Sequence, residues 1–249
     1  GVMQFMTDCV IRFDHRQVDR DSLREVRVVK YCGSDFASNK FPFVIGPEGI
    51  DMTSPGTGEI GYPVFTERVS SGIERLDTML GGGYFRGSNV LITGVPGTAK
   101  STLAGAFAEA ACRRGERTLY VSFDEAGGQI VRNLSSVGIR LRQHLQTGVL
   151  RMYSSQVEGR NAEEHTIQIK ALIREQKPRC VVIDPVSAMI KPGGSALDIA
   201  KRLVYLCKVG GITLICTCLL EGSSPEAEEP QIQISTIADT WIQLSYVVN

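Results

Sequence analysis

Alternating apolar and polar positions characterise the first fifty residues of the chain. In 24–33 (REVRVVKYCG) and 41–50 (FPFVIGPEGI), apolar residues fall at about every second position between Asp, Gly and Pro. This period places apolar side chains on one face of a strand, so the region is predicted to form strands and hairpins. Between Asp51 and Tyr62 the composition changes to DMTSPGTGEIGY, which favours a linker, placed here at 51–66.

From residue 67 onward, short apolar runs alternate with longer helical patterns. The runs predicted to be strands are 88–94, 117–125, 148–155, 180–184, 211–220 and 239–246. The segments predicted to be helices are 101–115, 128–138, 162–178 and 195–210. Such alternation with apolar strands is typical of an α/β domain whose central, mainly parallel sheet is covered on both faces. Ligands of such sheets bind at the carboxyl ends of the strands.

Composition and charge narrow the function classes. Lys plus Arg equals Asp plus Glu at 27 each, so net charge gives no reason to expect nucleic acid or an anionic membrane as partner. The seven cysteines are scattered without a C-x-x-C motif, which favours buried thiols in a reducing compartment. The sequence contains neither an apolar run of ~20 residues nor a signal-peptide pattern. These features predict a soluble cytoplasmic protein without a membrane partner.

The segment GVPGTAKST at 94–102 joins a predicted strand to a predicted helix. It matches the phosphate-binding pattern G-x-x-x-x-G-K-[ST] except at Ala99, where the pattern has glycine. Lysine would contact the terminal phosphates, and the serine hydroxyl would hold magnesium. A positive φ at Ala99 would cost about 1–2 kcal/mol, and a negative φ almost nothing. The candidate ATP-binding residues are Gly94, Val95, Pro96, Gly97, Thr98, Ala99, Lys100, Ser101 and Thr102. A strand-to-helix turn without a ligand is the alternative.

Acidic residues follow two of the predicted strands. Asp184 ends the apolar run in VIDPVS, where a carboxylate can hold Mg²⁺ together with Ser101. Asp124 and Glu125 end the strand after the loop helix, where an acid can polarise a water or hydroxyl for attack on the γ-phosphate. The predicted metal ligands are therefore Ser101 and Asp184, and the predicted catalytic residues are Asp124 and Glu125. Capping of the following helix is the alternative for the acid pair.

The loop and the acidic residues belong to longer stretches that resemble a known protein family. The stretch 68–103 (RVSSGIERLDTMLGGGYFRGSNVLITGVPGTAKSTL) resembles RecA-superfamily ATPases and, more closely, the KaiC family of clock ATPases and autokinases. The acid pair and segments 129–139, 180–189 and 234–246 extend this resemblance. It implies a RecA-like fold, Mg²⁺ and ATP as cofactors, a self-associating hexameric ring with ATP between subunits, and clock-type regulatory partners. The intact protein would then act as a ring-forming, clock-type switch.

The resemblance also implies a domain organisation. KaiC proteins have two RecA-like repeats, so 1–50 resembles the C-terminal segment of a preceding repeat, and 67–249 resembles the second ATPase domain. A weak internal echo agrees with this: MTDCVIRF at 6–13 and IADTWIQL at 237–244 share the order of polar and apolar residues. Many unrelated strands look like this, so the echo alone leaves repetition open.

Ser235 and Thr236 match the family position that receives phosphate, and they are the predicted phosphoacceptors. Hydroxyls that only bond backbone at a strand entry are the alternative. The chain departs from the family pattern at three other positions. Val137 replaces an aromatic residue, Cys32 replaces the arginine beside Lys30, and Pro230 replaces a hydroxyl residue.

Two other function classes stay open from the sequence. The first is a DNA-dependent ATPase of the RecA or helicase type, and the second is a nucleotide-stabilised scaffold. The stretch 221–239 holds five acids and neither lysine nor arginine, so it would repel a phosphate backbone. It is also typical of a solvated loop. Nucleic acid is therefore not expected as a partner, and a KaiC-like ATPase with serine/threonine autophosphorylation is the favoured function.

Overall fold

Two units make up the chain, which we describe from a computed structural model. One contains residues 1–59 and 158–168, and the other contains 60–157 and 169–249. The structure describes residues 7–18, 21–46, 49–52, 61–155, 162–189, 196–220 and 237–246.

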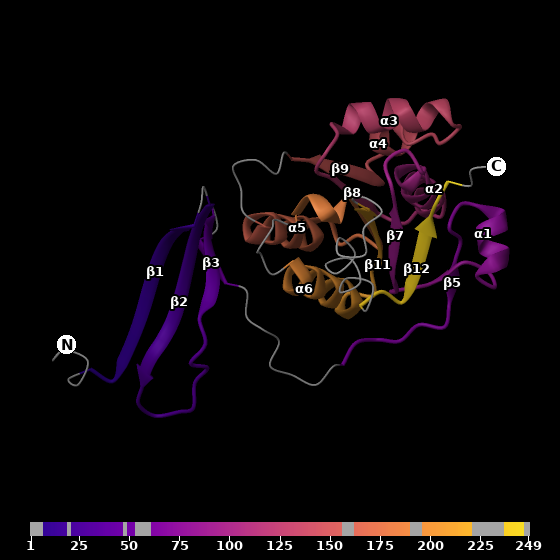
Figure 1. The fold of residues 1–249 in the computed structure, drawn as a ribbon. Coiled ribbons are helices and arrows are strands. Elements are labelled where there is room, and N and C mark those ends of the chain that lie inside the picture. Colours follow the sequence, from indigo (N-terminus) through magenta and orange to yellow (C-terminus); the bar gives the residue numbers. More distant parts are fainter. Residues whose placement is uncertain are drawn as a thin grey trace. The chain divides into compact units, whose positions relative to one another are not determined.

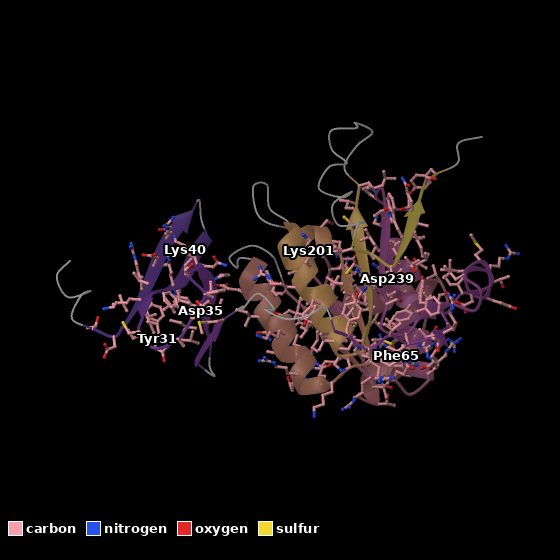
Figure 2. The ribbon with its side chains drawn as sticks, turned by 90° about the horizontal axis from the view of Figure 1, so that it is seen from below. Tyr31, Asp35, Lys40, Phe65, Lys201 and Asp239 are labelled. Carbon is pink, nitrogen blue, oxygen red and sulfur yellow. The ribbon has the colours of Figure 1, made fainter. Side chains whose placement is uncertain are left out.

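The first unit contains an antiparallel sheet whose strands are β1 (Cys9–Val18), β2 (Asp21–Tyr31), β3 (Phe41–Gly46) and β4 (Gly49–Met52), in that order (Figure 1). Val26 and Phe43 are buried on it, and the rings of Phe13 and Phe43 meet edge to face with centroids 5.4 Å apart. Lys40, labelled in Figure 2, forms an ion pair with Glu25 at 3.1 Å. The predicted hairpin-rich segment is therefore confirmed.

The second unit is built on a six-stranded sheet in which every pair of neighbours is parallel. Its order is β12-β7-β11-β10-β8-β9. The strands are β7 (Asn89–Gly94), β8 (Thr118–Ser122), β9 (Leu150–Ser154), β10 (Cys180–Asp184), β11 (Thr213–Leu219) and β12 (Thr240–Leu244). Strands β7, β8 and β10 are buried along their whole length, as their apolar sequences predict. The predicted α/β class with a parallel sheet is confirmed.

Helices lie on both sides of this sheet (Figure 1). They are α1 (Glu74–Met79), α2 (Lys100–Arg113), α3 (Gly127–Ser136), α4 (Arg142–Gln146), α5 (Ala162–Gln176) and α6 (Ala196–Val209). Helix α2 packs along the centre of one face and, with α3, encloses an apolar core around Phe107, Tyr120 and Leu134. Helix α2 ends where the sequence predicts, because Gly115 adopts a φ of +76° and its amide bonds back to Cys112.

Several short elements escape the sequence patterns. These are β5 (Arg68–Val69), β6 (Tyr84–Phe85), the 3-10 turn η2 (Val186–Met189), α1 and α4. Elements of two to six residues are too short to show a period.

Phe65, labelled in Figure 2, explains why two nearby residues are glycines. A Cβ on Gly211 would lie 2.9 Å from the Phe65 ring, and a Cβ on Gly87 would lie 3.1 Å from it.

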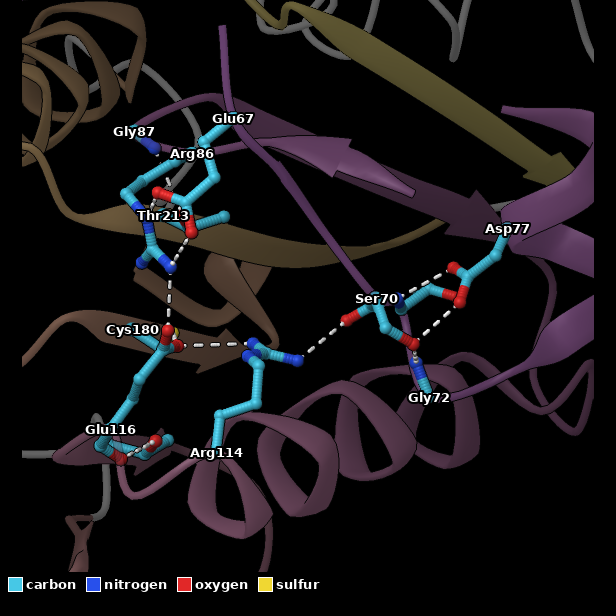
Figure 3. A network of polar contacts seen from close by, with 12 residues as sticks. Glu67, Ser70, Gly72, Asp77, Arg86, Gly87, Arg114, Glu116, Cys180 and Thr213 are labelled. Carbon is cyan, nitrogen blue, oxygen red and sulfur yellow. Dashed lines mark hydrogen bonds and ion pairs between the residues drawn. The ribbon is translucent and has the colours of Figure 1, made fainter. Parts of the chain in front are cut away.

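A network of polar contacts crosses the amino ends of the strands (Figure 3). Arg86 is buried and donates to both carboxylate oxygens of Glu67, at 2.5 and 2.8 Å, and to Glu116 at 2.7 Å. Arg114 donates to Glu116 at 3.1 Å and to the carbonyl of Ser70 at 3.2 Å. Arg86 precedes β7 and Glu116 precedes β8, so this network lies at the edge opposite to the carboxyl ends of the strands. It joins the starts of strands and is a structural feature.

Candidate functional site

The loop between β7 and α2 has the backbone of a tight phosphate-binding turn. Gly94 is the last residue of β7, and a Cβ there would lie 2.5 Å from the hydroxyl of Thr98 and 2.7 Å from the carbonyl of Leu244. Gly97 has a φ of +81°, a conformation that favours glycine. Both glycines of the loop are therefore required by the local backbone and its neighbours.

Ala99 adopts the left-handed conformation, with φ 69° and ψ 26°, immediately before α2. Of the two cases considered from the sequence, the costly one applies, because a non-glycine residue in this region loses about 1–2 kcal/mol. The backbone that the loop pattern assigns to glycine is thus kept although the residue is alanine. The missing glycine changes the energy of the loop and leaves its conformation in place.

Lys100 begins α2 and folds back over the loop. Its Nζ donates to the main-chain oxygens of Gly94 and Val95, each at 2.8 Å. Burial lowers the pKa of Lys100, and the nearby charge of Asp184 acts in the opposite direction. Removal from water makes the ammonium group a strong partner for an anion that reaches the loop. Ser101 follows in the first turn of α2 and is exposed.

Asp184 ends β10 and is 7 % exposed. Its carboxylate accepts a hydrogen bond from the hydroxyl of Tyr120 at 2.6 Å and another from the hydroxyl of Thr217. Burial raises the pKa of Tyr120 well above its ordinary value, and the adjacent Asp184 acts in the same direction, so the phenol remains a donor. Asp184 was predicted from the sequence, and Tyr120 was not. The signal that could have found it is a tyrosine, with its polar hydroxyl, within the fully buried strand β8.

The two acids after β8 have different surroundings. The hydroxyl of Ser122 fixes the backbone of Glu125 by donating to its carbonyl at 2.8 Å and accepting from its amide at 3.2 Å. The Glu125 carboxylate accepts a hydrogen bond from Nδ2 of Asn133 at 3.2 Å. Asp124 is an exposed residue, but its carboxyl group is partly covered by the protein. This partial burial and the charge of Asp184 raise the pKa of the carboxyl. The residue that precedes α3 as its N-cap is Ala126, so neither acid has the capping role weighed from the sequence.

The C-terminal strand adds two aromatic contacts to the loop region. Nε1 of Trp241 donates to the hydroxyl of Thr93 at 2.9 Å. The hydroxyl of Tyr246 donates to the carbonyl of Pro96 at 3.2 Å, and a Cβ on Gly97 would come within 2.5 Å of it. Neither aromatic residue was predicted from the sequence. Strand β12, through Trp241, and Tyr246, which follows this strand, thus support the loop region from the edge of the sheet.

The remaining residues singled out from the sequence are the predicted phosphoacceptors, Val137 and the cysteines. Ser235 and Thr236 lie outside the described part of the chain, as does most of the acidic stretch 221–239. Val137 ends α3 and is 59 % exposed. Cys9 and Cys32 are exposed, so the expectation of buried thiols is wrong for these two, which lie at strand ends of the small N-terminal sheet. The other five cysteines are buried.

The residues at the loop fit magnesium and a nucleotide phosphate. Ser101 offers a hydroxyl and Asp184 a carboxylate, the hard oxygen donors that Mg²⁺ prefers. Lys100 and the amides at the start of α2 provide the positive end that phosphate prefers. Within the described ranges, the helices are too short or too polar to cross a lipid bilayer.

The fold is that of a RecA-like domain, and the loop has the spacing of a phosphate-binding loop except at Ala99. The family model described as "ATPase: KaiC" matches residues 69–249, and the chain belongs to this family. It is 38 % identical over 248 residues to the circadian clock protein KaiC2 of a Synechocystis strain, which covers 98 % of this chain and 44 % of that protein. It is 32 % identical over 251 residues to the circadian clock oscillator protein KaiC of a Picosynechococcus strain, covering 99 % of this chain and 48 % of that protein.

KaiC3 of Synechocystis is 31 % identical over 253 residues, which covers 99 % of this chain and 50 % of that protein. The chain therefore spans about half the length of the curated relatives that it matches. The expected resemblance to KaiC is confirmed by these matches.

Proposed function

We propose that the chain binds Mg²⁺-ATP at residues 94–102 and hydrolyses it. The observation that carries this proposal is the convergence of three charged groups on the carboxyl edge of the sheet. Lys100 and Asp124 both lie close enough to Asp184 for its charge to influence their pKa values. Opposite and like charges placed together in this way are typical of sites that handle a charged substrate.

Each group has a defined task in this proposal. Lys100 would exchange its bonds to the carbonyls of the loop for bonds to the terminal phosphates. Ser101 and Asp184 would hold Mg²⁺, which neutralises charge on the β- and γ-phosphates. Asp124 would accept the proton of the attacking water, since its raised pKa favours proton uptake. The Glu125 carboxylate already accepts a hydrogen bond from Asn133 and would anchor the acid pair to α3 through this contact.

The experiment compares two matched amide variants of the acid pair. Asp124→Asn is expected to lower kcat for phosphate release by about 10²–10⁴-fold, the usual contribution of a general base, with the Kd for ATP within about threefold of wild type. Glu125→Gln keeps most of the contact surface of Glu125, and its kcat for phosphate release is expected to fall less than that of Asp124→Asn. Unchanged phosphate release in Asp124→Asn would rule out the assigned base. Failure of the wild-type chain to bind ATP would rule out the site.

We further propose that the intact protein phosphorylates its own Ser235 or Thr236. The attacking hydroxyl oxygen would form a bond to the γ-phosphorus while the bond to ADP breaks, and a carboxylate of the acid pair would take the proton. The support is the match of segment 234–246 to the family and the acid pair seen at the site. Mass spectrometry of the intact protein after ATP incubation tests this: phosphate only at other positions, or labelling that survives joint Asp124→Asn and Glu125→Gln substitution, would leave an ATPase without autokinase activity.

A hexameric ring with ATP at subunit interfaces is the corresponding proposal for assembly. The family resemblance supports it. Light scattering with and without Mg²⁺-ATP measures the mass directly, and a monomer under both conditions at high concentration would contradict the proposal. Regulatory partners of the clock type, a cytoplasmic location and the assignment of 1–50 to a preceding repeat stay predictions.

A further inference from the structure

A buried cluster of Tyr120, Asp184 and Thr217 lies beside the nucleotide loop, and the mechanism above uses only its carboxylate. Tyr120 comes from β8, Asp184 from the end of β10 and Thr217 from β11. In the sheet, β10 lies between β8 and β11, so one hydroxyl reaches the carboxylate from each neighbouring strand. Each hydroxyl donates to a different oxygen of Asp184.

The strand register explains how a distant ring reaches this carboxylate. Tyr120 is paired with Val182, two residues before Asp184 on β10, so the two side chains lie on the same face of the sheet. The phenol ring spans this offset and brings its hydroxyl to 2.6 Å from Oδ2 of Asp184. A shorter polar side chain at position 120 would not span two residues of strand. The contact therefore depends on the length of tyrosine.

Burial makes these hydrogen bonds specific. Tyr120 and Thr217 are both 0 % exposed, and Asp184 is 7 % exposed. Water has little access to compete for the carboxylate, and hydrogen bonds to an ionised acceptor are about twice as strong as neutral ones. With one donor fixed on each oxygen, the carboxylate plane cannot rotate without breaking a bond.

We propose that Tyr120 and Thr217 are positioning residues for the magnesium site, because their hydroxyls fix the rotation of the Asp184 carboxylate on which Mg²⁺-dependent ATP affinity depends. This inference rests on the proposed function of the same site. It assigns to the two hydroxyls a task that neither apolar packing nor the strand pattern requires. Neither residue would touch ATP or the metal itself.

The test measures the Kd for ATP by calorimetry on the full chain, once in EDTA and once in excess Mg²⁺. Tyr120→Phe keeps the ring and removes only the hydroxyl. It is expected to leave the affinity in EDTA within about twofold of wild type and to reduce the gain from Mg²⁺ by about tenfold. Thr217→Val, which has nearly the same shape, should do the same, and Thr217→Ser, which keeps the hydroxyl, should behave as wild type.

Tyr84→Phe is the matched control. Tyr84 is also a buried tyrosine, 2 % exposed, and its ring packs edge to face on Phe107. It should keep the wild-type gain from Mg²⁺. A full Mg²⁺ gain in both Tyr120→Phe and Thr217→Val would overturn the proposal. So would equal losses in EDTA and Mg²⁺, which would indicate a general disturbance of the fold. If the wild-type chain itself does not bind ATP, the proposed function is overturned instead. The wild-type titration alone shows this, without any variant.

Discussion

The Nζ of Lys100 donates a hydrogen bond of 2.8 Å to the main-chain oxygen of Gly94, six residues earlier in the chain. This contact holds the charged Nζ against the main chain of the loop, at the start of α2. A cation held this way requires little reorganisation when a phosphate arrives, because the side chain already lies at the loop. A substitution of Lys100 therefore tests the role of this cation directly.

Lys100→Met should weaken ATP binding by roughly 10- to 100-fold, the range expected when hydrogen bonds from a charged donor are lost. Methionine keeps much of the aliphatic stem and removes the charge. Lys201→Met is the control, since Lys201 is an exposed lysine on α6. Calorimetry measures both. Equal affinity in Lys100→Met and wild type would contradict the assignment of the loop.

Ala99→Gly should stabilise the chain by about 0.5–1 kcal/mol. Relief of the left-handed strain at φ 69° exceeds the greater entropy that glycine adds to the unfolded chain. The same change at Ala171, an exposed position inside α5, should destabilise by about 0.5–1 kcal/mol. Urea unfolding followed by circular dichroism gives both values. A loss of stability in Ala99→Gly would mean that the alanine side chain contributes contacts of its own.

Asp124→Asn should raise the melting temperature at pH 7. Burial and the charge of Asp184 raise the pKa of Asp124 above its ordinary value of 3.8, so the folded chain holds this proton more tightly than the unfolded chain does. That contribution to stability is present below pH 3.8 and is lost as the pH rises through the folded pKa. Asparagine removes the unfavourable charge, and the gain should be under about 1 kcal/mol because the residue is exposed.

Calorimetric melting of wild type and Asp124→Asn between pH 4 and pH 8 checks this sign. The difference in melting temperature should shrink as the pH falls toward 4. Glu125→Gln is the control, because its carboxylate accepts a hydrogen bond from Asn133 and the variant should gain no stability. A constant difference across the pH range would show that charge is not the cause.

Arg86→Met should destabilise the chain by about 3 kcal/mol or more, because it removes a buried guanidinium and leaves the partly buried carboxylate of Glu116 with one fewer partner. Arg151→Met is the control: its side chain is 49 % exposed, that of its partner Glu175 is 61 % exposed, and their ion pair should contribute under about 1 kcal/mol. The double variant Arg86→Met with Glu116→Gln should recover part of the loss. Urea unfolding measures all three, and equal effects at the two arginines would contradict the structural role of the network.

The same network should make the chain sensitive to acid. Burial acts to raise the pKa of Glu116, but hydrogen bonds from Arg114, Arg86 and Cys180 outweigh it and lower the pKa below 4.5. The stabilisation is therefore present above pH 4.5 and is lost as the pH falls through the folded pKa. In the Glu116→Gln variant, stability should fall less steeply than in wild type below pH 4.5.

Local sequence determined much of the fold. The strands β7, β8 and β10 and the helix α2 follow from apolar runs and helical periods that depend only on neighbouring residues. The loop at 94–102 was recognisable because phosphate binding needs particular residue types at fixed spacing. Asp124, Glu125 and Asp184 were placed at one edge because the carboxyl ends of parallel strands meet there.

Tertiary structure decided what lies close to these residues. Tyr120 meets Asp184 across 64 positions of sequence, and Thr217 meets it across 33, because β8 and β11 are the neighbours of β10 in the sheet. Strand order and register set that meeting, and a local pattern encodes neither. The left-handed backbone of Ala99 was likewise undecided by sequence, since alanine alone favours negative φ. The fold imposes it because the turn from β7 into α2 must close within a few residues.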